Sequence, residues 1–332
     1  MRLIIQIPCF NEAETLPVTL SNLPDRIDGI DEIRVLVIDD GSTDGTAEAA
    51  RKAGADHVLV LPENRGLAYA FRAGLDEAVR LGADIILNTD ADNQYRGQDV
   101  PRLVEPILAG RAEMVIGTRD IDAIAEFSAS KKMLQRLGSR VVRMVSGTRV
   151  SDATSGFRAF SREAALRLNV FSSFSYTLET IIQAGKCNIS MAFVPVGTNP
   201  KLRESRLYSS TASYLTNSIQ TILRIYTLYE PLKAFTLIGL VPVLLGSLIG
   251  VRFLYYFFTS GSQGHVQSLI LASILIILGF LTIVFGLLAD LNGANRRLIE
   301  DALFRMRKLE LEQGTKDGNN APSRKDEGTG AL

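Results

Sequence analysis

The stretch Leu87-Asn88-Thr89-Asp90-Ala91-Asp92-Asn93-Gln94-Tyr95 joins an apolar run to two carboxylates spaced two residues apart. The run 83–87 is typical of a buried strand, so both carboxylates should lie close together just past its end. Two carboxylates held this close repel each other unless a cation compensates them. Oxygen ligands favour a hard ion, Mg²⁺ or Mn²⁺, held by one or two carboxylates and substrate phosphates. A solvated acidic turn that caps the next helix is the alternative interpretation.

Apolar runs and amphipathic segments alternate through the first two hundred residues. The apolar runs predict strands at residues 3–7, 34–38, 57–61, 85–87 and 114–116, with helices between them. Alternation at this spacing is typical of an α/β fold with a mostly parallel sheet and helices on both faces. In such sheets, ligands bind beyond the carboxyl ends of the strands.

Polar side chains follow each predicted strand, at residues 8–12, 39–42, 63–66, 90–92 and 117–119. Five polar strand ends predict an active site along one edge of the sheet. Each cluster also has a structural alternative, because an asparagine or acid can start a helix or cap a turn. Where two acids are adjacent, as at Asp39 and Asp40, only one is needed as a cap, and the other can bind a base N–H or a ribose hydroxyl. An arginine before a helix suits a diphosphate, although a plain surface arginine is commoner.

Composition restricts the class of protein. The chain has 332 residues with 36 basic and 36 acidic side chains, so nothing indicates a nucleic-acid partner. Cys9 and Cys187 fit no metal-binding spacing, and we expect them to be buried thiols in a reducing compartment. A predicted strand begins almost at Met1 without a signal peptide, so we expect the catalytic part to be cytoplasmic.

Two long apolar runs near the C-terminus predict membrane spans at residues 233–258 and 266–290. Each run holds about 24 residues, roughly 36 Å as a helix, which crosses a hydrocarbon core of about 30 Å. A buried helical hairpin is the alternative. The loop between the runs has no Lys or Arg, whereas basic residues flank the pair on its other side: Arg224, Lys233, Arg296, Arg297 and Arg305. The positive-inside rule therefore predicts that both termini are cytoplasmic.

Three further segments border these spans. The segment 128–145 alternates basic and apolar side chains, which predicts a basic amphipathic helix lying on an anionic membrane surface, or else an ordinary helix with a solvated basic face. Residues 208–232 predict an interfacial helical region. Residues 291–312 predict a cytosolic helix, and the polar tail 313–332 predicts disorder.

Taken together, the motifs resemble those of the family 2 glycosyltransferases of the GT-A fold, and within them the polyprenyl-phosphate (dolichol-phosphate mannose or glucose) synthases. The matching segments are Pro8-x-x-Asn11-Glu12, Asp39-Asp40-Gly41-Ser42-x-Asp44-Gly45-Thr46, Asn64-x-Gly66, Asp90-Ala91-Asp92-x-Gln94, Gly117-Thr118-Arg119, Ser151-Asp152-x-x-Ser155-Gly156-Phe157-Arg158 and Glu204-Ser205-Arg206-Leu207. The resemblance covers roughly residues 1–210 and implies a GT-A domain over 1–207.

The resemblance implies a role for each matching position. Asp90 and Asp92 would hold Mg²⁺ or Mn²⁺. The nucleotide sugar would contact Pro8, Phe10, Glu12, Asp39, Asp40, Arg65, Asp90, Ala91, Asp92 and Gln94. The acceptor phosphate would contact Arg119, Lys131, Ser205 and Arg206, and the catalytic set would be Asp90, Asp92, Arg119 and Arg206. Four positions depart from the family pattern: Phe10 replaces a Tyr, Arg203 a Gly, Arg206 a Lys, and Gln135 a Ser. The departures at Arg206 and Gln135 leave the geometry of the acceptor shell open.

The implied reaction is the transfer of a hexose from a UDP- or GDP-sugar to an undecaprenyl or dolichyl phosphate, with inversion. A phosphate monoester is largely dianionic at neutral pH, so the reaction needs no strong general base. This agrees with a chain whose two histidines are His57 and His265. A processive synthase would need a Q-x-x-R-W segment, and the chain has no Trp. A different lipid or glycan acceptor, an inactive membrane scaffold and a homo-oligomer remain compatible with the sequence.

Overall fold

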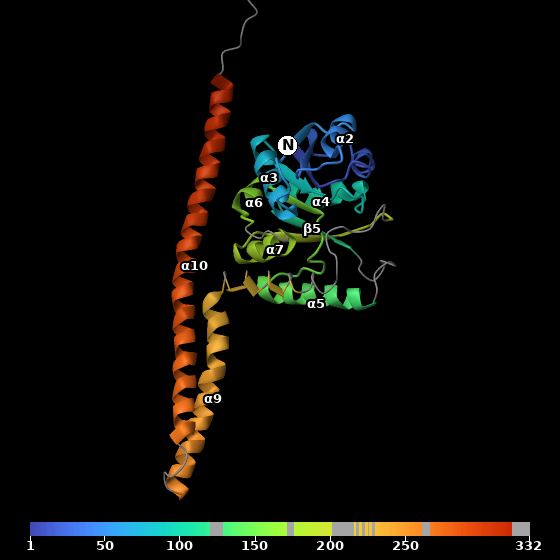
Figure 1. Cartoon of the computed structure of the whole chain (residues 1–332). Coiled ribbons are helices and arrows are strands. Elements are labelled where there is room, and N and C mark those ends of the chain that lie inside the picture. Colours follow the sequence, from blue (N-terminus) through green and yellow to red (C-terminus); the bar gives the residue numbers. More distant parts are fainter. Residues whose placement is uncertain are drawn as a thin grey trace, which may run out of the picture.

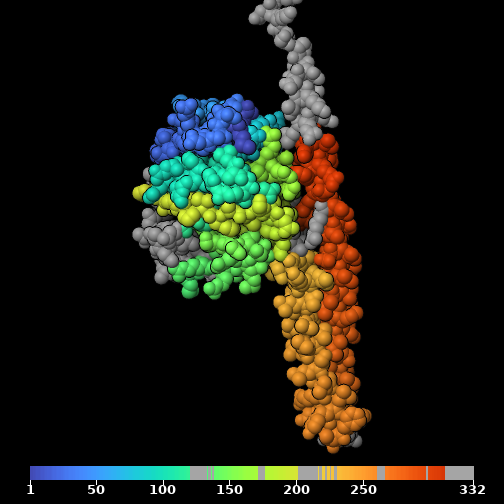
Figure 2. Space-filling model, turned by 180° about the vertical axis from the view of Figure 1, so that it is seen from behind, coloured from blue at the N-terminus to red at the C-terminus, as the bar shows by residue number. Residues whose placement is uncertain are grey.

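A computed structural model describes residues 1–119, 129–170, 176–200, 230–260 and 266–320, with single positions between 216 and 227. It consists of a layered α/β domain beside two long helices that project beyond it (Figure 1). The space-filling view from behind shows the same arrangement, with the two helices packed against each other below the domain (Figure 2).

The described domain is built around a seven-stranded sheet of order β3-β2-β1-β4-β6-β5-β7. The strands are β1 Arg2–Cys9, β2 Glu32–Asp39, β3 His57–Val60, β4 Ile85–Asn88, β5 Met114–Arg119, β6 Arg158–Ser161 and β7 Met191–Val196. Only β6 runs antiparallel to its neighbours, β4 and β5. All five predicted strands are confirmed, and the sheet is mostly parallel as predicted. The sequence analysis did not identify β6 and β7.

Helices cover both faces of the sheet. Their bounds are α1 Leu16–Ser21, α2 Thr46–Lys52, α3 Leu67–Arg80, α4 Val100–Leu108, α5 Ala129–Ser146, α6 Arg162–Arg167 and α7 Tyr176–Lys186, with a short 3₁₀ helix η1 Gly97–Asp99. Side chains of α3, α5, α6 and α7 form one core cluster, and those of α1, α2 and α4 form the other. Along β1, Ile4 enters the first cluster whereas Leu3 and Ile5 enter the second, as the two-residue period of a strand requires.

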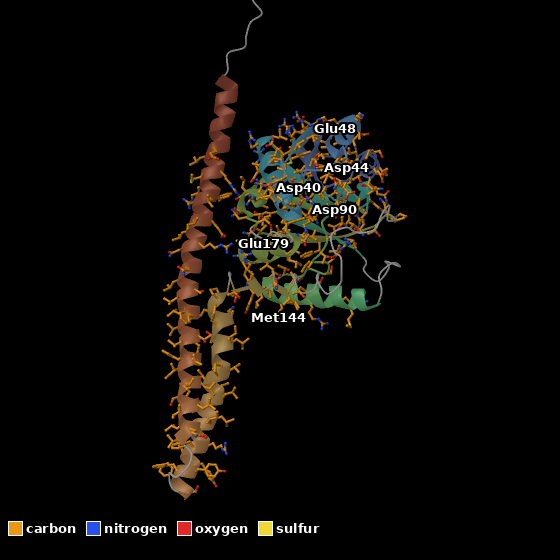
Figure 3. The ribbon with its side chains drawn as sticks, in the orientation of Figure 1. Asp40, Asp44, Glu48, Asp90, Met144 and Glu179 are labelled. Carbon is orange, nitrogen blue, oxygen red and sulfur yellow. The ribbon has the colours of Figure 1, made fainter. Side chains whose placement is uncertain are left out.

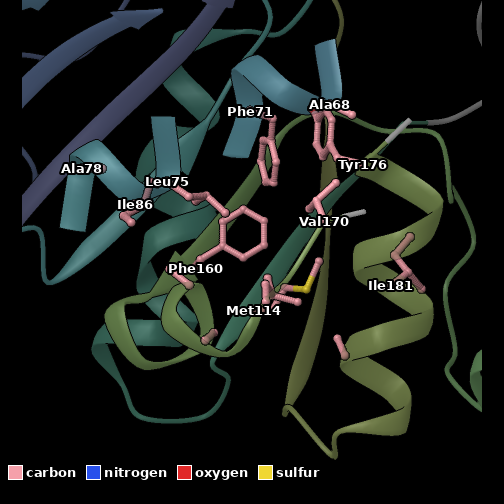
Figure 4. Packing of buried hydrophobic residues seen from close by; sticks show 14 of the residues in the cluster. Ala68, Phe71, Leu75, Ala78, Ile86, Met114, Phe160, Val170, Tyr176 and Ile181 are labelled. Carbon is pink, nitrogen blue, oxygen red and sulfur yellow. The ribbon is translucent and has the colours of Figure 1, made fainter. Parts of the chain in front are cut away.

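An aromatic group fixes the packing beneath the site. The ring of Phe71 from α3 stacks on Tyr176 from α7 at 3.8 Å between centroids, and Phe160 from β6 contacts its edge at 5.9 Å. Figure 4 shows these three rings together with Met114 of β5. The packing holds α7 against α3, so the hydroxyl of Tyr176 faces the residues that follow β4.

The helices α9 Pro231–Ser260 and α10 Val266–Asn320 contain the two predicted spans. Both are long and apolar enough to cross a membrane, and only 17% of the most apolar window of each is buried within the described chain. Their large apolar side chains point outward, which a buried hairpin would not allow. The helices cross closely at Gly239 and Gly279, where a Cβ on either would lie 2.6 Å from the other's carbonyl oxygen.

The C-terminal part of α10 lies against the α/β domain of its own chain (Figures 1 and 2). Phe304 packs on the first core cluster. The Arg167 guanidinium lies over its ring, 5.2 Å from the ring centroid. Arg307 donates to the carbonyl of Leu166 at 3.3 Å. The structure joins the second predicted span and the predicted cytosolic helix in one element, which continues to Asn320, into the segment where composition predicts disorder.

Candidate active site

A cavity of about 350 Å³ opens at the carboxyl ends of β1, β2 and β4. Its lining includes seven of the predicted site residues: Pro8, Phe10, Glu12, Asp40, Asp90, Ala91 and Asp92. Asn11, Asn64 and Gly66 from the other strand-end clusters also line it. Asp39 and Arg65 adjoin lining residues in the sequence and Gln94 follows Asp92 by two positions, but none of the three is in the lining. The fold therefore gathers segments far apart in the chain at the predicted edge of the sheet (Figure 3).

The loop after β1 is tied to the loop after β2. The backbone N–H of Asn11 donates to Ser42 Oγ at 2.8 Å, and its side-chain oxygen accepts from the Thr43 N–H at 2.9 Å. The Glu12 N–H donates to Thr46 Oγ1 at 2.9 Å. Asn11 therefore does not cap α1, whose N-cap position is Thr15. Phe10 lies just before these anchored residues. It leaves 43% of its surface exposed at the cavity, which suits stacking on a flat ring.

The two adjacent acids after β2 have different surroundings. Asp40 accepts hydrogen bonds from the backbone N–H groups of Arg65 and Gly66, at 2.9 and 2.8 Å. Burial raises the pKa of Asp40, and these two hydrogen bonds oppose that rise. Asp39 accepts from the Ser42 N–H at 3.0 Å. Asp40 therefore shapes the start of α3, a role that its sequence position does not reveal.

The carboxylates of Asp90 and Asp92 face the cavity just past β4. Asp92 accepts from the Gln94 N–H at 3.1 Å, which stabilises the turn. Asp90 packs directly on Gly156: a Cβ built there would lie 2.8 and 2.9 Å from its two carboxylate oxygens. Burial, and then the charge of Asp92, raise the pKa of Asp90 to about 7, against the opposing charges of Arg119 and Arg158. The two carboxylates therefore repel each other at the cavity, and burial adds to the cost of charging Asp90.

A divalent cation fits this donor set. Among the residues that the structure describes, no three His, Cys, Asp or Glu side chains form a metal-binding group. Two carboxylates open to a cavity are nevertheless the usual protein share of a Mg²⁺ or Mn²⁺ site that phosphate oxygens complete. After burial, repulsion by Asp92 is the second cause of the raised pKa of Asp90. A cation held between the two carboxylates would offset that repulsion.

Arg119 forms a buried, two-pronged ion pair with Asp152. Its Nε donates to Asp152 Oδ2 at 2.7 Å and its Nη2 to Oδ1 at 3.1 Å, and Nη2 also donates to Thr154 Oγ1 at 2.8 Å. The two side chains are 7% and 1% exposed. The guanidinium and nearby hydrogen bonds lower the pKa of Asp152 despite its burial. Asp152 thus orients a basic residue beside the acidic pair.

Behind the acidic pair lies a buried polar network that the sequence analysis did not identify. Asn88 donates through Nδ2 to the Gly156 carbonyl and to the Tyr176 hydroxyl, at 2.8 and 2.9 Å. Arg158 is fully buried and donates to four neutral acceptors: the carbonyls of Ala153, Ser155 and Thr177, and Thr180 Oγ1. The available sequence signals were Asn88 directly after the apolar run 83–87 and Arg158 at the end of the matching segment that begins at Ser151.

The remaining predicted contacts belong to the acceptor side. Ser205 and Arg206 lie outside the described residues. Lys131 belongs to the first turn of α5, and its side chain also lies outside the description. Arg65, which was predicted to contact the nucleotide sugar, donates to Glu63 at 3.2 Å and to Tyr69 at 3.1 Å. The structure therefore assembles the donor side of the predicted site and one member of the acceptor side, Arg119.

A mixed α/β sheet with an acidic pair at its rim, bordering a cavity of nucleotide size, defines a GT-A type of glycosyltransferase. The family model described as glycosyl transferase family 2 matches residues 4–168. An undecaprenyl-phosphate mannosyltransferase from Micrococcus luteus is 34% identical over 53% of this chain and 74% of its own length. A polyprenol monophosphomannose synthase from Mycolicibacterium smegmatis is 27% identical, over 59% and 76%.

Solved structures agree on the fold. Glucosyl-3-phosphoglycerate synthase from Mycobacterium tuberculosis, crystallised with Mn²⁺, UDP-glucose and phosphoglyceric acid, aligns with a TM-score of 0.55. The alignment covers 68% of this chain and 79% of that one at 22% identity. The chain belongs to glycosyl transferase family 2, among the polyprenyl-phosphate glycosyltransferases.

Proposed function

We propose that this enzyme transfers a hexose from a UDP- or GDP-sugar to the phosphate of a polyprenyl lipid, with inversion at the anomeric carbon. The observation that carries the proposal is the pair of carboxylates, Asp90 and Asp92, that line one cavity in a domain joined to two apolar helices. The relatives described as polyprenyl-phosphate sugar transferases support the acceptor class.

The donor would occupy the cavity with its base near Phe10 and its diphosphate near the acidic pair. Glu12, on the anchored loop after β1, and Asp39, the last residue of β2, would accept hydrogen bonds from the base or ribose. A divalent ion held by Asp90 and Asp92 would offset the negative charge that develops on the leaving nucleoside diphosphate. Gln94, fixed by Asp92 through its backbone N–H, would border the sugar diphosphate.

The acceptor phosphate would supply its own nucleophile. Its second pKa is about 6, so at neutral pH an anionic oxygen can attack the anomeric carbon while the bond to the nucleoside diphosphate breaks. The protein then has to hold two anions in line and offset their charge. Arg119, oriented by Asp152, is the described residue for that role, and Lys131, Ser205 and Arg206 are the proposed partners.

We also propose that the catalytic domain and both termini are cytoplasmic, with α9 and α10 crossing the membrane. The basic residues at the ends of the helix pair support this orientation. The two helices leave the domain on the side of α5, so a lipid phosphate at the inner surface would lie near the domain (Figure 1).

The direct test uses the full chain, purified in detergent, with undecaprenyl phosphate, Mn²⁺ and a panel of UDP- and GDP-sugars. We expect one donor to release nucleoside diphosphate only when lipid and metal are both present, with formation of the lipid-linked sugar. Asp92→Asn should abolish both, whereas Asp28→Asn, at an exposed site away from the cavity, should not. No turnover with any donor would favour a membrane scaffold, and transfer to another acceptor would contradict the lipid assignment.

A further inference from the structure

The helix α5 presents a basic and apolar face to its surroundings. Met133 and Met144 are 68% and 79% exposed, and Arg136, Arg140 and Arg143 are exposed on the same side. Their spacing of three or four residues places them on one face of the helix. Large methionines exposed beside arginines are typical of a helix that lies in a lipid headgroup region.

The opposite face of α5 is packed into the domain. Ser139, Val142 and Ser146 are buried there. The helix crosses α7 so closely that a Cβ on Gly185 would lie 2.2 Å from the Ser146 carbonyl oxygen. Because α5 is packed into the domain on this side, its basic face points away from the domain.

That direction is the one in which the apolar helices leave the domain. Figure 1 shows α5 lying crosswise at the end of the domain where α9 begins, and Figure 3 shows Met144 on the side away from the sheet. The view from behind places α5 at the same end of the domain (Figure 2). If α9 and α10 cross a bilayer, the outer face of α5 meets its surface.

We propose that this face of α5 docks on anionic phospholipid headgroups, and that docking positions Arg119 for the acceptor. The arginines match the negative surface charge, and the methionines match the boundary between headgroups and acyl chains. The positioning step rests on the proposed function, whereas the docking step does not.

A short chain of contacts connects α5 to Arg119. The Ala153 N–H donates to Ser139 Oγ on the buried face of α5 at 3.2 Å. The preceding residue, Asp152, holds the Arg119 guanidinium through two hydrogen bonds. A shift of α5 therefore changes where the Asp152 carboxylate aims Arg119. Ser139 is a positioning residue in this scheme.

Docking can be measured directly because the chain has no tryptophan. Met144→Trp places a single reporter on the face, and Glu48→Trp places one on α2 at the far end of the domain (Figure 3). The full chain is reconstituted in nanodiscs of phosphatidylcholine with or without phosphatidylglycerol, with brominated acyl chains as quencher. We expect the reporter at 144 to be quenched, more strongly with phosphatidylglycerol, and the reporter at 48 to be unaffected.

The charges are tested in the same reporter background. Arg140→Gln and Arg143→Gln should each weaken docking on phosphatidylglycerol discs about fivefold, because one basic residue near an anionic surface contributes about 1 kcal/mol. Arg26→Gln, at an exposed site elsewhere, should have no effect. Equal quenching with and without phosphatidylglycerol would overturn the anionic preference. No quenching at 144 would overturn docking altogether and indicate a protein partner.

The positioning step needs a variant that docks normally. Ser139→Ala should keep the quenching at 144 and raise the KM for undecaprenyl phosphate more than the KM for the sugar nucleotide. Ser146→Ala is the matched control, because that buried hydroxyl bonds to the Val142 carbonyl at 2.6 Å and to Thr148, and not to the segment that holds Asp152. Equal KM values for wild type and Ser139→Ala would overturn the coupling. If wild type itself transfers no sugar, the proposed function fails while the quenching still decides docking.

Discussion

Replacing Gly156 with alanine should displace the carboxylate of Asp90. The new Cβ would lie 2.8 and 2.9 Å from the two Asp90 oxygens and 2.9 Å from the Tyr176 hydroxyl, whereas ordinary contacts begin at 3.4 Å. The carboxylate must therefore move by at least the difference, 3.4 − 2.8 = 0.6 Å. Overpacking of this kind costs about 1–3 kcal/mol, and a displacement near 1 Å at a reacting centre costs about 100-fold in rate.

The assay combines three measurements on Gly156→Ala: Mn²⁺ affinity by electron paramagnetic resonance, turnover, and the thermal unfolding midpoint in detergent. We expect weaker Mn²⁺ binding, turnover reduced between 10-fold and 100-fold, and a lower midpoint. Gly138→Ala is the control, because nothing lies within 4 Å of a Cβ there and alanine favours the helix. Wild-type Mn²⁺ affinity and turnover in Gly156→Ala would refute the geometry.

Three more predictions follow from the buried charges. In the metal-free protein, the Asp90 pKa of about 7 lies above its ordinary value, so unfolding midpoints should fall as the pH rises from about 4 toward 7. Excess Mn²⁺ should reverse that fall in wild type, whereas Asp90→Asn should show neither the fall nor the response to Mn²⁺. Asp152→Asn leaves the buried Arg119 without its ion pair and should cost about 3–5 kcal/mol of stability, measured by thermal unfolding, as well as acceptor turnover. Arg158→Met removes four hydrogen bonds and should destabilise more than Arg158→Lys, which keeps the charge; equal midpoints would contradict this.

The sequence predicted those parts of the site that depend on local pattern. Strands with apolar cores, acids two residues apart and uncharged runs of spanning length are all visible in a short window. In the structure these patterns correspond to the five predicted strands, the cavity lined by Asp90 and Asp92, and the two apolar helices. The β6 strand escaped because four residues beginning with a buried Arg do not show a strand pattern.

The supporting network escaped for a different reason. Asn88 bonds to Gly156 and Tyr176, which lie 68 and 88 residues further along the chain. Asp40 likewise bonds to backbone groups 25 and 26 residues away, so its role in shaping the start of α3 follows from the fold. Local sequence shows which side chains can bond, and only the packed sheet decides which of them meet.

The charges around the site separate its donor side from its acceptor side. On the proposed donor side, Asp90 and Asp92 face a cavity and repel each other, so we expect a cation to enter with the nucleotide sugar. On the acceptor side, Arg119 is already neutralised by Asp152, and its bonded nitrogens leave the guanidinium oriented but with little net charge to offer. A dianionic lipid phosphate needs more positive charge than that pair supplies. Among the described residues, the exposed Arg136, Arg140 and Arg143 of α5 are a further source of positive charge. We therefore expect binding of the acceptor to depend on how α5 meets the lipid surface.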